Sequence, residues 1–414
     1  MIYLKPAPGI QENLCSTARR AIVCTRGQGV NALAVVRSLG RAGITVHVIS
    51  AEGPNNLALS SRYCVEKHLL NEGSPEALEL VIKKIARDNK CEPIVYFDND
   101  RMLASLASLQ REFVEPFIST SPFSIVRRFL DKRNQNQAAA TAGLNVPESW
   151  FPATWGDLEQ LPSGTNRKLI AKARYVGSAS PFPFKVISAN DGPQLVSLLK
   201  TFSIRPSDIL VQDFIDGADK NVFIAMCFVG SNSETSVIVT GRKLIQSGKG
   251  SGGVMALGRA EPNKYLEDLT RLLITHLGYQ GLIGVEFKYC ERSNRYYFIE
   301  VSARPERFNG LAAAAGIDLT LIAYRDANRD DISQLVNIAQ KDSIWIDVHG
   351  CWSAFRQNLN FGVLKQVMGT LLLRHRCAVF ALDDWAPTMA AWRATARDIG
   401  RRIVRKFRKI FGAT

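Results

Sequence analysis

The sequence predicts a chain of mixed α/β and α+β structure, with a Rossmann-like domain first, a larger α+β region after it and a helical extension at the C-terminus. Three features lead to this prediction. Residues 21–49 read as strand, glycine turn, helix and strand, which is the order of a βαβ unit. Residues 281–304 read as a β-hairpin that carries two acids. Residues 396–411 have the apolar periodicity of a basic amphipathic helix.

The first domain is predicted to follow a leader, residues 1–20, and to span residues 21–120. Three small residues after its first strand match the pattern G-x-G-x-x-A: Gly27, Gly29 and Ala32. This pattern is typical of a dinucleotide site, and it also occurs in a tight strand-to-helix turn that binds nothing. Arg26 inside the turn, and the lack of a second nucleotide motif of this type, favour the tight turn.

The alternation of helix and strand continues through this domain. A helix is expected over residues 75–89 and a strand over residues 93–97. Asp98 and Asp100 come directly after that strand, at the edge where open α/β sheets bind ligands. Acids at this place also cap the helix that follows, so the sequence leaves a ligand role and a capping role open.

The second region, residues 121–330, carries charged residues in unusual places. A helix holds Asp131 and Lys132, and Lys172 lies inside the apolar strand 168–173. A lysine is uncommon in a buried strand unless an anion meets it. The other elements expected here are three strands, a glycine-rich loop and a helix, at residues 209–215, 221–229, 235–245, 246–258 and 264–277. The loop holds more glycines than a surface hairpin needs, and such loops offer backbone N–H groups to phosphates.

The hairpin is expected to pair residues 283–289 with residues 295–301. Glu286 and Glu300 interrupt these strands among residues suited to a buried sheet. A buried carboxylate is costly unless a cation or strong donors satisfy it, and acids on two adjacent strands can reach a shared Mg²⁺. The alternative is that both acids face solvent on an ordinary amphipathic sheet. Arg304 follows four residues after Glu300 and adds a cation near the same place.

The composition limits the class of protein. With 414 residues, 46% hydrophobic and 22% charged, the chain is expected to form two or three folded domains. Eight cysteines without a CxxC pair indicate neither a zinc framework nor a disulfide scaffold. No signal peptide and no apolar run of about 18 residues is found, which predicts a cytoplasmic protein. The five histidines form no catalytic constellation and are interpreted as structural.

The C-terminal extension, residues 331–414, concentrates the positive charge. The net charge is +14, and residues 393–409 hold eight basic residues against one acid, so nucleic acid is not the expected partner. The segment 396–411 has an apolar stripe made of Ile399, Ile403, Phe407 and Ile410. Basic residues outside that stripe include Arg401, Arg402, Arg405, Lys406 and Lys409. Such a helix lies on an anionic membrane or docks on the protein body, and its terminal position favours peripheral contact with the inner membrane face.

Between residues 21 and 319 these motifs resemble the ATP-grasp superfamily of carboxylate-activating ligases, and most closely its carboligase-like group. D-alanine:D-alanine ligase, biotin carboxylase and the large subunit of carbamoyl phosphate synthase belong to this superfamily. The resemblance implies a Rossmann-like pre-ATP-grasp domain followed by two α+β lobes that clamp ATP between them.

The resemblance also assigns nucleotide-binding roles. It implies that Lys132, in the LDK motif, and Lys172, in LIAKA, contact the phosphates of ATP, while Asp219 takes the ribose hydroxyls. It implies a hinge strand whose backbone holds adenine, formed by Gln212, Asp213, Phe214 and Ile215.

For the metal and the chemistry, the resemblance implies that Glu286 and Glu300 hold Mg²⁺ or Mn²⁺, and that Arg304 faces the transferred phosphoryl group or the acyl substrate. Two departures from the family pattern matter. Ser302 stands where E-x-N-x-R has asparagine, which weakens the ligand set for a second Mg²⁺. The segment 177–184, normally a glycine-rich lid, has two prolines and two phenylalanines, which predicts a less mobile lid.

The resulting prediction is an ATP- and Mg²⁺-dependent ligase that activates a carboxylate as an acyl phosphate and joins it to an amine. Its partners would be small-molecule carboxylates and amines, and Arg307, an extra cation, indicates an anionic substrate such as an amino acid. An alternative is a non-catalytic nucleotide-binding regulatory or scaffold protein, in which Ser302 and the altered lid mark lost catalysis. A third is a dinucleotide-dependent oxidoreductase that uses Gly27 and Gly29.

Overall fold

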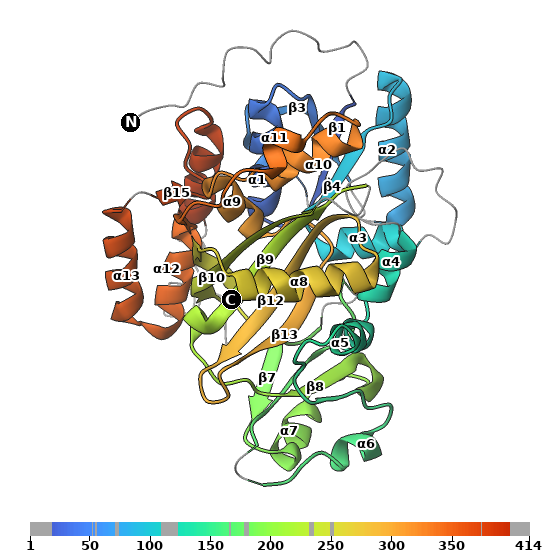
Figure 1. Ribbon diagram of the computed structural model, residues 1–414, viewed down its shortest axis with the longest axis vertical. Helices are drawn as coiled ribbons and strands as arrows, with labels where there is room; N and C mark the ends of the chain where they lie inside the picture. The colour runs from blue at the N-terminus through green and yellow to red at the C-terminus, as the bar shows by residue number, and fades with distance from the viewer. Residues whose placement is uncertain are drawn as a thin grey trace, which may run out of the picture.

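The computed structural model contains three β-sheets, which the chain forms one after another (Figure 1). In this view the first sheet lies at the top, the smallest at the bottom and the largest between them. The structure describes residues 19–51, 53, 56–70, 74–108, 123–164, 167–177, 182–231, 236–248, 252–373 and 375–397. The predicted domain boundary near residue 120 and the amphipathic stripe from Ile399 onward lie outside these residues.

The first sheet is the Rossmann-like unit that the sequence predicts. Its four parallel strands run in the order β3-β2-β1-β4. Their bounds are Ala21–Thr25 for β1, Val46–Ser50 for β2, Cys64–Leu69 for β3 and Ile94–Phe97 for β4. The helices of this unit are α1 (Val30–Arg41), α2 (Pro75–Asn89) and α3 (Asp100–Ala107). The central strands β1 and β2 are buried along their whole length, as expected of parallel strands covered on both faces.

The glycine turn after β1 is tight because the side chain of Asn56 packs against it. Gly27 and Gly29 have φ of 71° and 70°, a backbone conformation that favours glycine. A Cβ on Gly29 would lie 2.1 Å from the side-chain oxygen of Asn56, and the Asn56 amide donates to the carbonyl oxygen of Gly27 at 2.9 Å. The close approach that these glycines allow is therefore made by Asn56, which agrees with the tight-turn interpretation.

The smallest sheet has the strand order β5-β8-β6-β7 and its own apolar core. Its strands are β5 (Ser149–Trp150), β6 (Leu169–Ala173), β7 (Val186–Ala189) and β8 (Ile209–Asp213). Helices α6 (Trp155–Glu159) and α7 (Gly192–Leu199) pack beside it, and α4 (Phe123–Phe129) and α5 (Lys132–Thr141) precede it in the chain. The strand predicted over residues 209–215 is too long, because β8 ends at Asp213.

The largest sheet has seven strands in the order β13-β12-β9-β10-β11-β14-β15. These are β9 (Val222–Val229), β10 (Ser236–Ser247), β11 (Val254–Ala260), β12 (Gly281–Cys290), β13 (Arg295–Ser302), β14 (Ser343–Ile346) and β15 (His375–Cys377). All neighbours are antiparallel except β14 and β15. The glycine-rich loop predicted over residues 246–258 is shorter than expected, because Val254 already begins β11.

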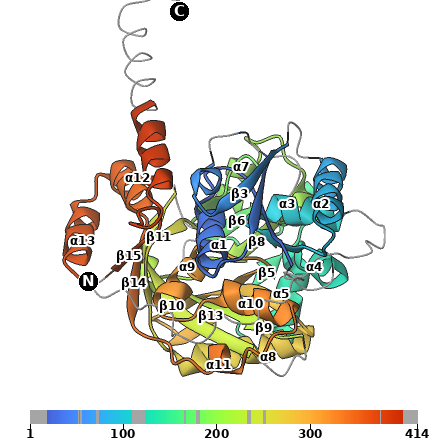
Figure 2. The same cartoon turned by 90° about the horizontal axis from the view of Figure 1, so that it is seen from above.

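Helices cover this sheet from both sides. Helix α8 (Lys264–Leu277), found as predicted, crosses one face (Figures 1 and 2). Helices α9 (Arg307–Ala314) and α10 (Leu319–Ala327) lie between the sheet and the first unit, where Tyr96 of β4 donates to the carbonyl oxygen of Thr320 at 3.2 Å. Helices α11 (Ser333–Val336), α12 (Val348–Asn358) and α13 (Phe361–Leu371) follow. None of the helices in the described part of the chain is long and apolar enough to span a membrane.

A buried ion pair joins the C-terminal part of the chain to α1. Nε of Arg37 donates to a carboxylate oxygen of Asp384 at 2.9 Å, and both side chains are almost fully buried. Arg37 also donates to the carbonyl oxygen of Asp384 at 2.7 Å and to that of Val379 at 2.8 Å. Ser61 donates to the same carboxylate at 2.7 Å. Each of these buried groups thus depends on partners more than 300 residues away in the sequence.

We expect Arg37→Ala to lower the free energy of unfolding by about 3 kcal/mol, because the Asp384 carboxylate would stay buried without its cation. Chemical denaturation followed by circular dichroism measures the change. The matched control is Arg41→Ala, which removes the partly exposed pair with Asp383 and should cost less than about 1 kcal/mol. Equal losses of unfolding free energy in the two variants would show that the buried pair stabilises the fold no more than the partly exposed one.

Candidate functional site

A cavity of about 1040 Å³ opens where the three sheets approach one another. Its lining comes from the turn after β1, the end of β4, strands β6 and β8, and strands β9, β12 and β13. Nine lining residues are lysine or arginine and seven are aspartate or glutamate. The cavity is therefore rich in charge and positive on balance, which suits an anionic ligand held together with a metal cation.

Glu286 and Glu300 face each other across the hairpin of β12 and β13. They are direct partners in the antiparallel register and both line the cavity, so their side chains leave the same face of the sheet. The register shifts immediately afterwards, because Phe287 pairs with Phe298 and Ile299 is left as the extra residue of a bulge. The predicted hairpin is confirmed, and the two acids do not point to opposite faces.

Helix α5 fixes the outer edge of β13 beside Glu300. The side-chain amide of Gln135 pairs with both backbone groups of Val301, accepting from its N–H at 3.0 Å and donating to its carbonyl oxygen at 3.3 Å. Asp131 caps α5. These contacts place Lys132, the first residue of the helix, with its Nζ 3.7 Å from a carboxylate oxygen of Glu300.

Two more lysines reach the acids from other strands. Lys243 of β10 forms a buried ion pair with Glu286. Lys172 of β6 is 6% exposed, and its Nζ donates to the carbonyl oxygen of Ile299 at 3.5 Å. Burial, helped by repulsion from Lys132, lowers the pKa of Lys172 to about 8. The expectation that Lys172 meets anions inside a buried strand is therefore met by two carboxylates.

The lysines in turn control the charge of Glu300. Burial would raise its pKa, but the surrounding ammonium groups outweigh burial and hold the pKa well below its usual range. The lysines that do so are Lys132, Lys172, Lys185 and Lys243. Glu300 is consequently an ionised carboxylate at neutral pH, which is the form that binds a divalent cation.

Arg304 connects this group to the first sheet. Its guanidinium donates to both carboxylate oxygens of Asp100 at 2.6 Å, and although burial opposes its charge, Asp100 keeps the pKa of Arg304 above its ordinary value. Asp98 is buried beside the same wall, and burial raises its pKa to about 6. Asn99, not either acid, caps α3, so the capping interpretation of Asp98 and Asp100 is wrong.

The residues expected to bind adenine and ribose line another wall of the cavity. They are Gln212, Asp213, Phe214, Ile215 and Asp219. The Gln212 amide donates to the Ser149 hydroxyl at 2.9 Å, and the ammonium of Lys168 lies 4.0 Å from the centre of the Phe214 ring. Asp219 accepts hydrogen bonds from the backbone and the side chain of Gln246 at 3.0 and 2.9 Å.

Ser302 and Arg307 also line the cavity, but their side chains have partners. The Ser302 hydroxyl hydrogen-bonds the carboxyl of Glu306, whose pKa burial raises. Arg307 pairs with Asp347 and donates to the carbonyl oxygen of Met255 at 3.0 Å. Because Asp347 balances its charge, Arg307 gives less support to an anionic substrate than the sequence suggested.

The charged residues of this site that were not predicted from the sequence include Lys185, Lys243 and Glu306. Lys243 carries the signal that revealed Lys172, a lysine within an apolar strand, and could have been found by it. Lys185 lies just before β7, where no local pattern marks it. Glu306 lies after the hairpin, and only the folding of α9 against the sheet brings it to Ser302.

Comparison with known proteins agrees with this geometry. Residues 258–335 match the family described as carbamoyl-phosphate synthase L chain, ATP binding domain. The L-amino acid ligase from Bacillus licheniformis is similar in structure over 78% of each chain, with a TM-score of 0.56 and 16% identity. The biotin carboxylase domain of 2-oxoglutarate carboxylase from Hydrogenobacter thermophilus is similar over 78% of this chain and 73% of that one, with a TM-score of 0.59 and 15% identity.

The chain has the ATP-grasp fold. The predicted fold class and the resemblance to ATP-grasp proteins are thereby confirmed. In sequence, D-aspartate ligase from Enterococcus faecium (strain Aus0004) is 22% identical over 147 residues, which are 34% of this chain. The aligned part spans 35% of that relative, about a third of its length. Because the cavity lies within this fold, the role of each lining residue can be tested separately.

The titration of Lys172 should make the free energy of unfolding depend on pH. Its pKa falls from an ordinary 10.5 to about 8 on folding, so the unfolded chain binds more protons between these values. Below pH 8 the folded protein pays the full cost of burying the charged Lys172 ammonium. This cost falls as pH rises, because the folded protein then loses that proton. We expect the unfolding free energy of the wild type, relative to Lys172→Met, to rise by about 3 kcal/mol across this window.

Urea denaturation of both proteins at several pH values within the window measures this difference. Lys168→Met, which removes an exposed lysine just before the same strand, is the matched control. A wild-type-minus-variant difference that is independent of pH would show that Lys172 is not a buried titrating group.

Proposed function

We propose that this protein is an ATP- and Mg²⁺-dependent ligase that activates a carboxylate as an acyl phosphate and joins it to an amine. The observation that carries the proposal is the pairing of Glu286 with Glu300 on adjacent strands, inside a cavity where lysines from four other segments lie near them. The ATP-grasp fold supports it, as does the similarity to proteins named as ligases, among them an L-amino acid ligase and a D-aspartate ligase.

Glu286 and Glu300 fit a magnesium site. Mg²⁺ is bound by one or two carboxylates together with phosphate oxygens, and these two carboxylates are direct neighbours on one sheet face. Mn²⁺ accepts the same oxygen ligands. A bound metal would neutralise charge on the phosphates of ATP. Ser302 and Glu306, joined by a hydrogen bond at the end of β13, are the further oxygen donors nearby.

The cationic residues fit the phosphates. Lys132 and Lys172 approach the cavity from different elements and would hold the β- and γ-phosphates, while Arg304, oriented by Asp100, would face the transferred group or the acyl substrate. On the opposite wall, the segment from Gln212 to Ile215 would hold adenine through its backbone, and Asp219 would accept from the ribose hydroxyls.

This set of residues is sufficient for the chemistry. A carboxylate does not react with an amine at neutral pH, because hydroxide is a poor leaving group. Transfer of the γ-phosphoryl group to the carboxylate replaces that leaving group by phosphate, which the amine displaces. Phosphoryl transfer depends on positioning and on neutralising charge, so it needs no protein nucleophile. The lysines and Arg304 of the cavity supply both.

A non-catalytic nucleotide-binding protein is the second candidate. Ser302 in place of asparagine and the proline-containing lid favour it, since both departures remove features associated with turnover. Release of phosphate from MgATP, screened with amino acids and short peptides, separates the two candidates. Substrate-stimulated release supports the ligase, whereas tight ATP binding without stimulated release supports the scaffold.

We expect Glu300→Gln to abolish substrate-stimulated phosphate release while leaving the fold intact. The change removes the metal-binding charge in a side chain that is 38% exposed, so the structure tolerates an amide there. The loss of one such charge contact raises the barrier by about 3 kcal/mol, or roughly 100-fold in rate. Steady-state phosphate release and circular dichroism give the two readouts.

Glu76→Gln, in the first turn of α2 and outside the cavity, is the matched control for this experiment. It should retain the wild-type rate. If Glu300→Gln also retained that rate, Glu300 would not belong to the metal site.

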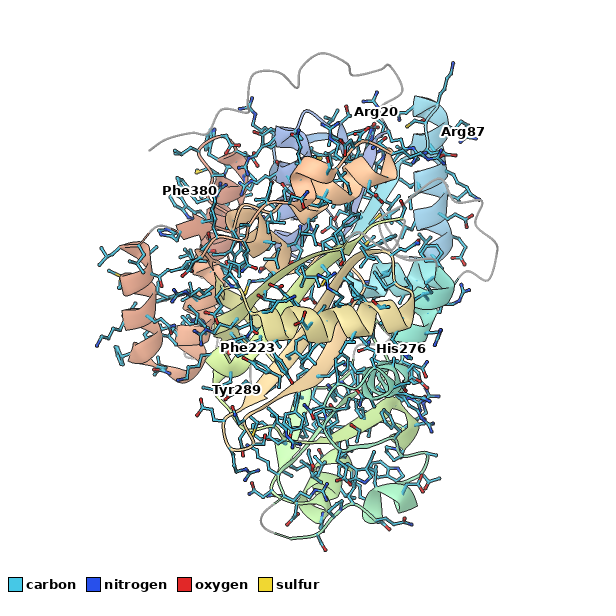
Figure 3. The ribbon with its side chains drawn as sticks, in the orientation of Figure 1. Arg20, Arg87, Phe223, His276, Tyr289 and Phe380 are labelled. Atoms are coloured by element: carbon cyan, nitrogen blue, oxygen red, sulfur yellow. The ribbon has the colours of Figure 1, made fainter. Side chains whose placement is uncertain are left out.

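We propose in addition that residues 396–411 contact the inner membrane face. Their sequence pattern supports this, and so does a set of exposed apolar side chains on the helices of the C-terminal extension: Trp352, Phe361, Met368, Leu372 and Trp392. Phe380 is a further exposed apolar residue of this part of the chain (Figure 3). A basic segment and exposed apolar side chains in the same extension supply the two attractions that interfacial binding needs.

Co-sedimentation with vesicles tests the membrane contact. The full chain should bind vesicles that contain anionic phospholipid, weakly bind purely zwitterionic ones, and dissociate as salt is raised. Deletion of residues 398–414 should remove the binding, because each basic residue near the surface contributes about 1 kcal/mol. Binding that survives the deletion would exclude the basic segment as the anchor.

A further inference from the structure

Two histidines and a glutamate meet at the free edge of the first sheet. His47 lies on β2, and Glu66 and His68 lie on the edge strand β3. Alternation along β3 puts Glu66 and His68 on the same side. The register between the strands shifts after Val46, and this shift places Glu66 directly opposite His47. None of the three residues lines the central cavity, so this cluster is separate from the ATP-grasp site.

The spacing of the three side chains is that of metal ligands. Nδ1 of His47 lies 3.4 Å from Nε2 of His68 and 3.2 Å from a carboxylate oxygen of Glu66. Nε2 of His68 lies 3.8 Å from the other carboxylate oxygen. Zn²⁺ binds nitrogen and oxygen ligands at about 2.0–2.1 Å in a tetrahedron, which sets neighbouring ligand atoms roughly 3.3–3.4 Å apart. The observed separations lie on both sides of this value, so a small ion fits between the two imidazole nitrogens and the Glu66 carboxylate.

The protonation of the cluster also suits a cation. Burial lowers the pKa of both imidazoles, although the Glu66 carboxylate beside them opposes this shift. Neutral imidazoles with a free electron pair are the form that ligates metals. The His47 side chain is 4% exposed while that of Glu66 is 58% exposed, so an ion can enter from the Glu66 side.

We propose that His47, Glu66 and His68 bind one Zn²⁺ ion, with water in the fourth coordination position. Imidazole ligands select Zn²⁺ over Mg²⁺, which prefers sites made of oxygen alone, so this site and the carboxylates of the central cavity would take different metals. The ion would tie β3 to β2. Since β3 is the outermost strand of this sheet within the described residues, a metal bridge would stabilise the edge of the sheet.

The experiment titrates Zn²⁺ into the full-length protein after treatment with EDTA, with excess Mg²⁺ present to occupy oxygen sites. We expect one Zn²⁺ per chain, measured by competition with a chromophoric chelator, and a higher melting temperature with Zn²⁺ than with Mg²⁺ alone. Co²⁺ in place of Zn²⁺ should give the intense visible absorption of a four-coordinate ion. His68→Ala should weaken binding by at least 10-fold and remove this absorption.

Two variants make the result decisive. Glu66→Gln changes an exposed side chain and should weaken binding without affecting the fold, which covers the case in which His68→Ala does not fold. His276→Ala is the matched control, because His276 lies on α8, far from Arg20 and the first sheet (Figure 3), and should bind Zn²⁺ as the wild type does. Zn²⁺ binding that is absent, or unchanged in both His68→Ala and Glu66→Gln, would overturn the proposal. Phosphate release from MgATP plays no part in these readouts.

Discussion

The cavity depends on one electrostatic constraint, which is that two carboxylates on adjacent strands of a buried sheet need cations beside them. Glu286 and Glu300 are direct cross-strand partners, and like charges so close destabilise each other unless they are compensated. The compensation comes from Lys132 on α5, Lys172 on β6 and Lys243 on β10. Two of these three cations lie outside the sheet that holds the acids.

This distribution of charges links the parts of the fold. The smallest sheet contributes Lys172 to the acids of the largest sheet, and the first sheet contributes Asp100 to Arg304, which follows the hairpin. Gln135 adds a neutral contact that holds α5 against the edge strand β13. Each sheet therefore places at least one charged side chain in the cavity, and the relative position of the sheets is set partly by these pairs. Fixed charges in a partly buried site stabilise a charged ligand without having to reorganise around it.

The sequence predicted the elements well where the signal is local. The strand with Lys172, the helix over residues 264–277 and the hairpin with its two acids each follow from periodicity, capping and residue type within a short window. Distant pairings have no such signal. Arg304 and Asp100 are 204 residues apart, and nothing near either residue indicates the other. The length of β11 was missed because Val254 and Met255 pair with Ser247 and Gln246 of β10, and this pairing overrides the glycine-rich pattern before it.

The histidines show the same limit of sequence-based prediction, which is that contacts between distant residues leave no local signal. His47 and His68, 21 residues apart, were interpreted as structural because the histidines form no catalytic constellation in the sequence. What brings them together is a register shift between two parallel strands, which moves Glu66 opposite His47. A one-residue shift in a strand reverses the side on which each side chain lies, so the cluster exists only in this register. The same argument applies to the bulge just before Glu300, where Ile299 is the extra residue and its carbonyl oxygen accepts from Lys172. In both places an irregularity in strand pairing, not a sequence motif, decides which charged groups meet.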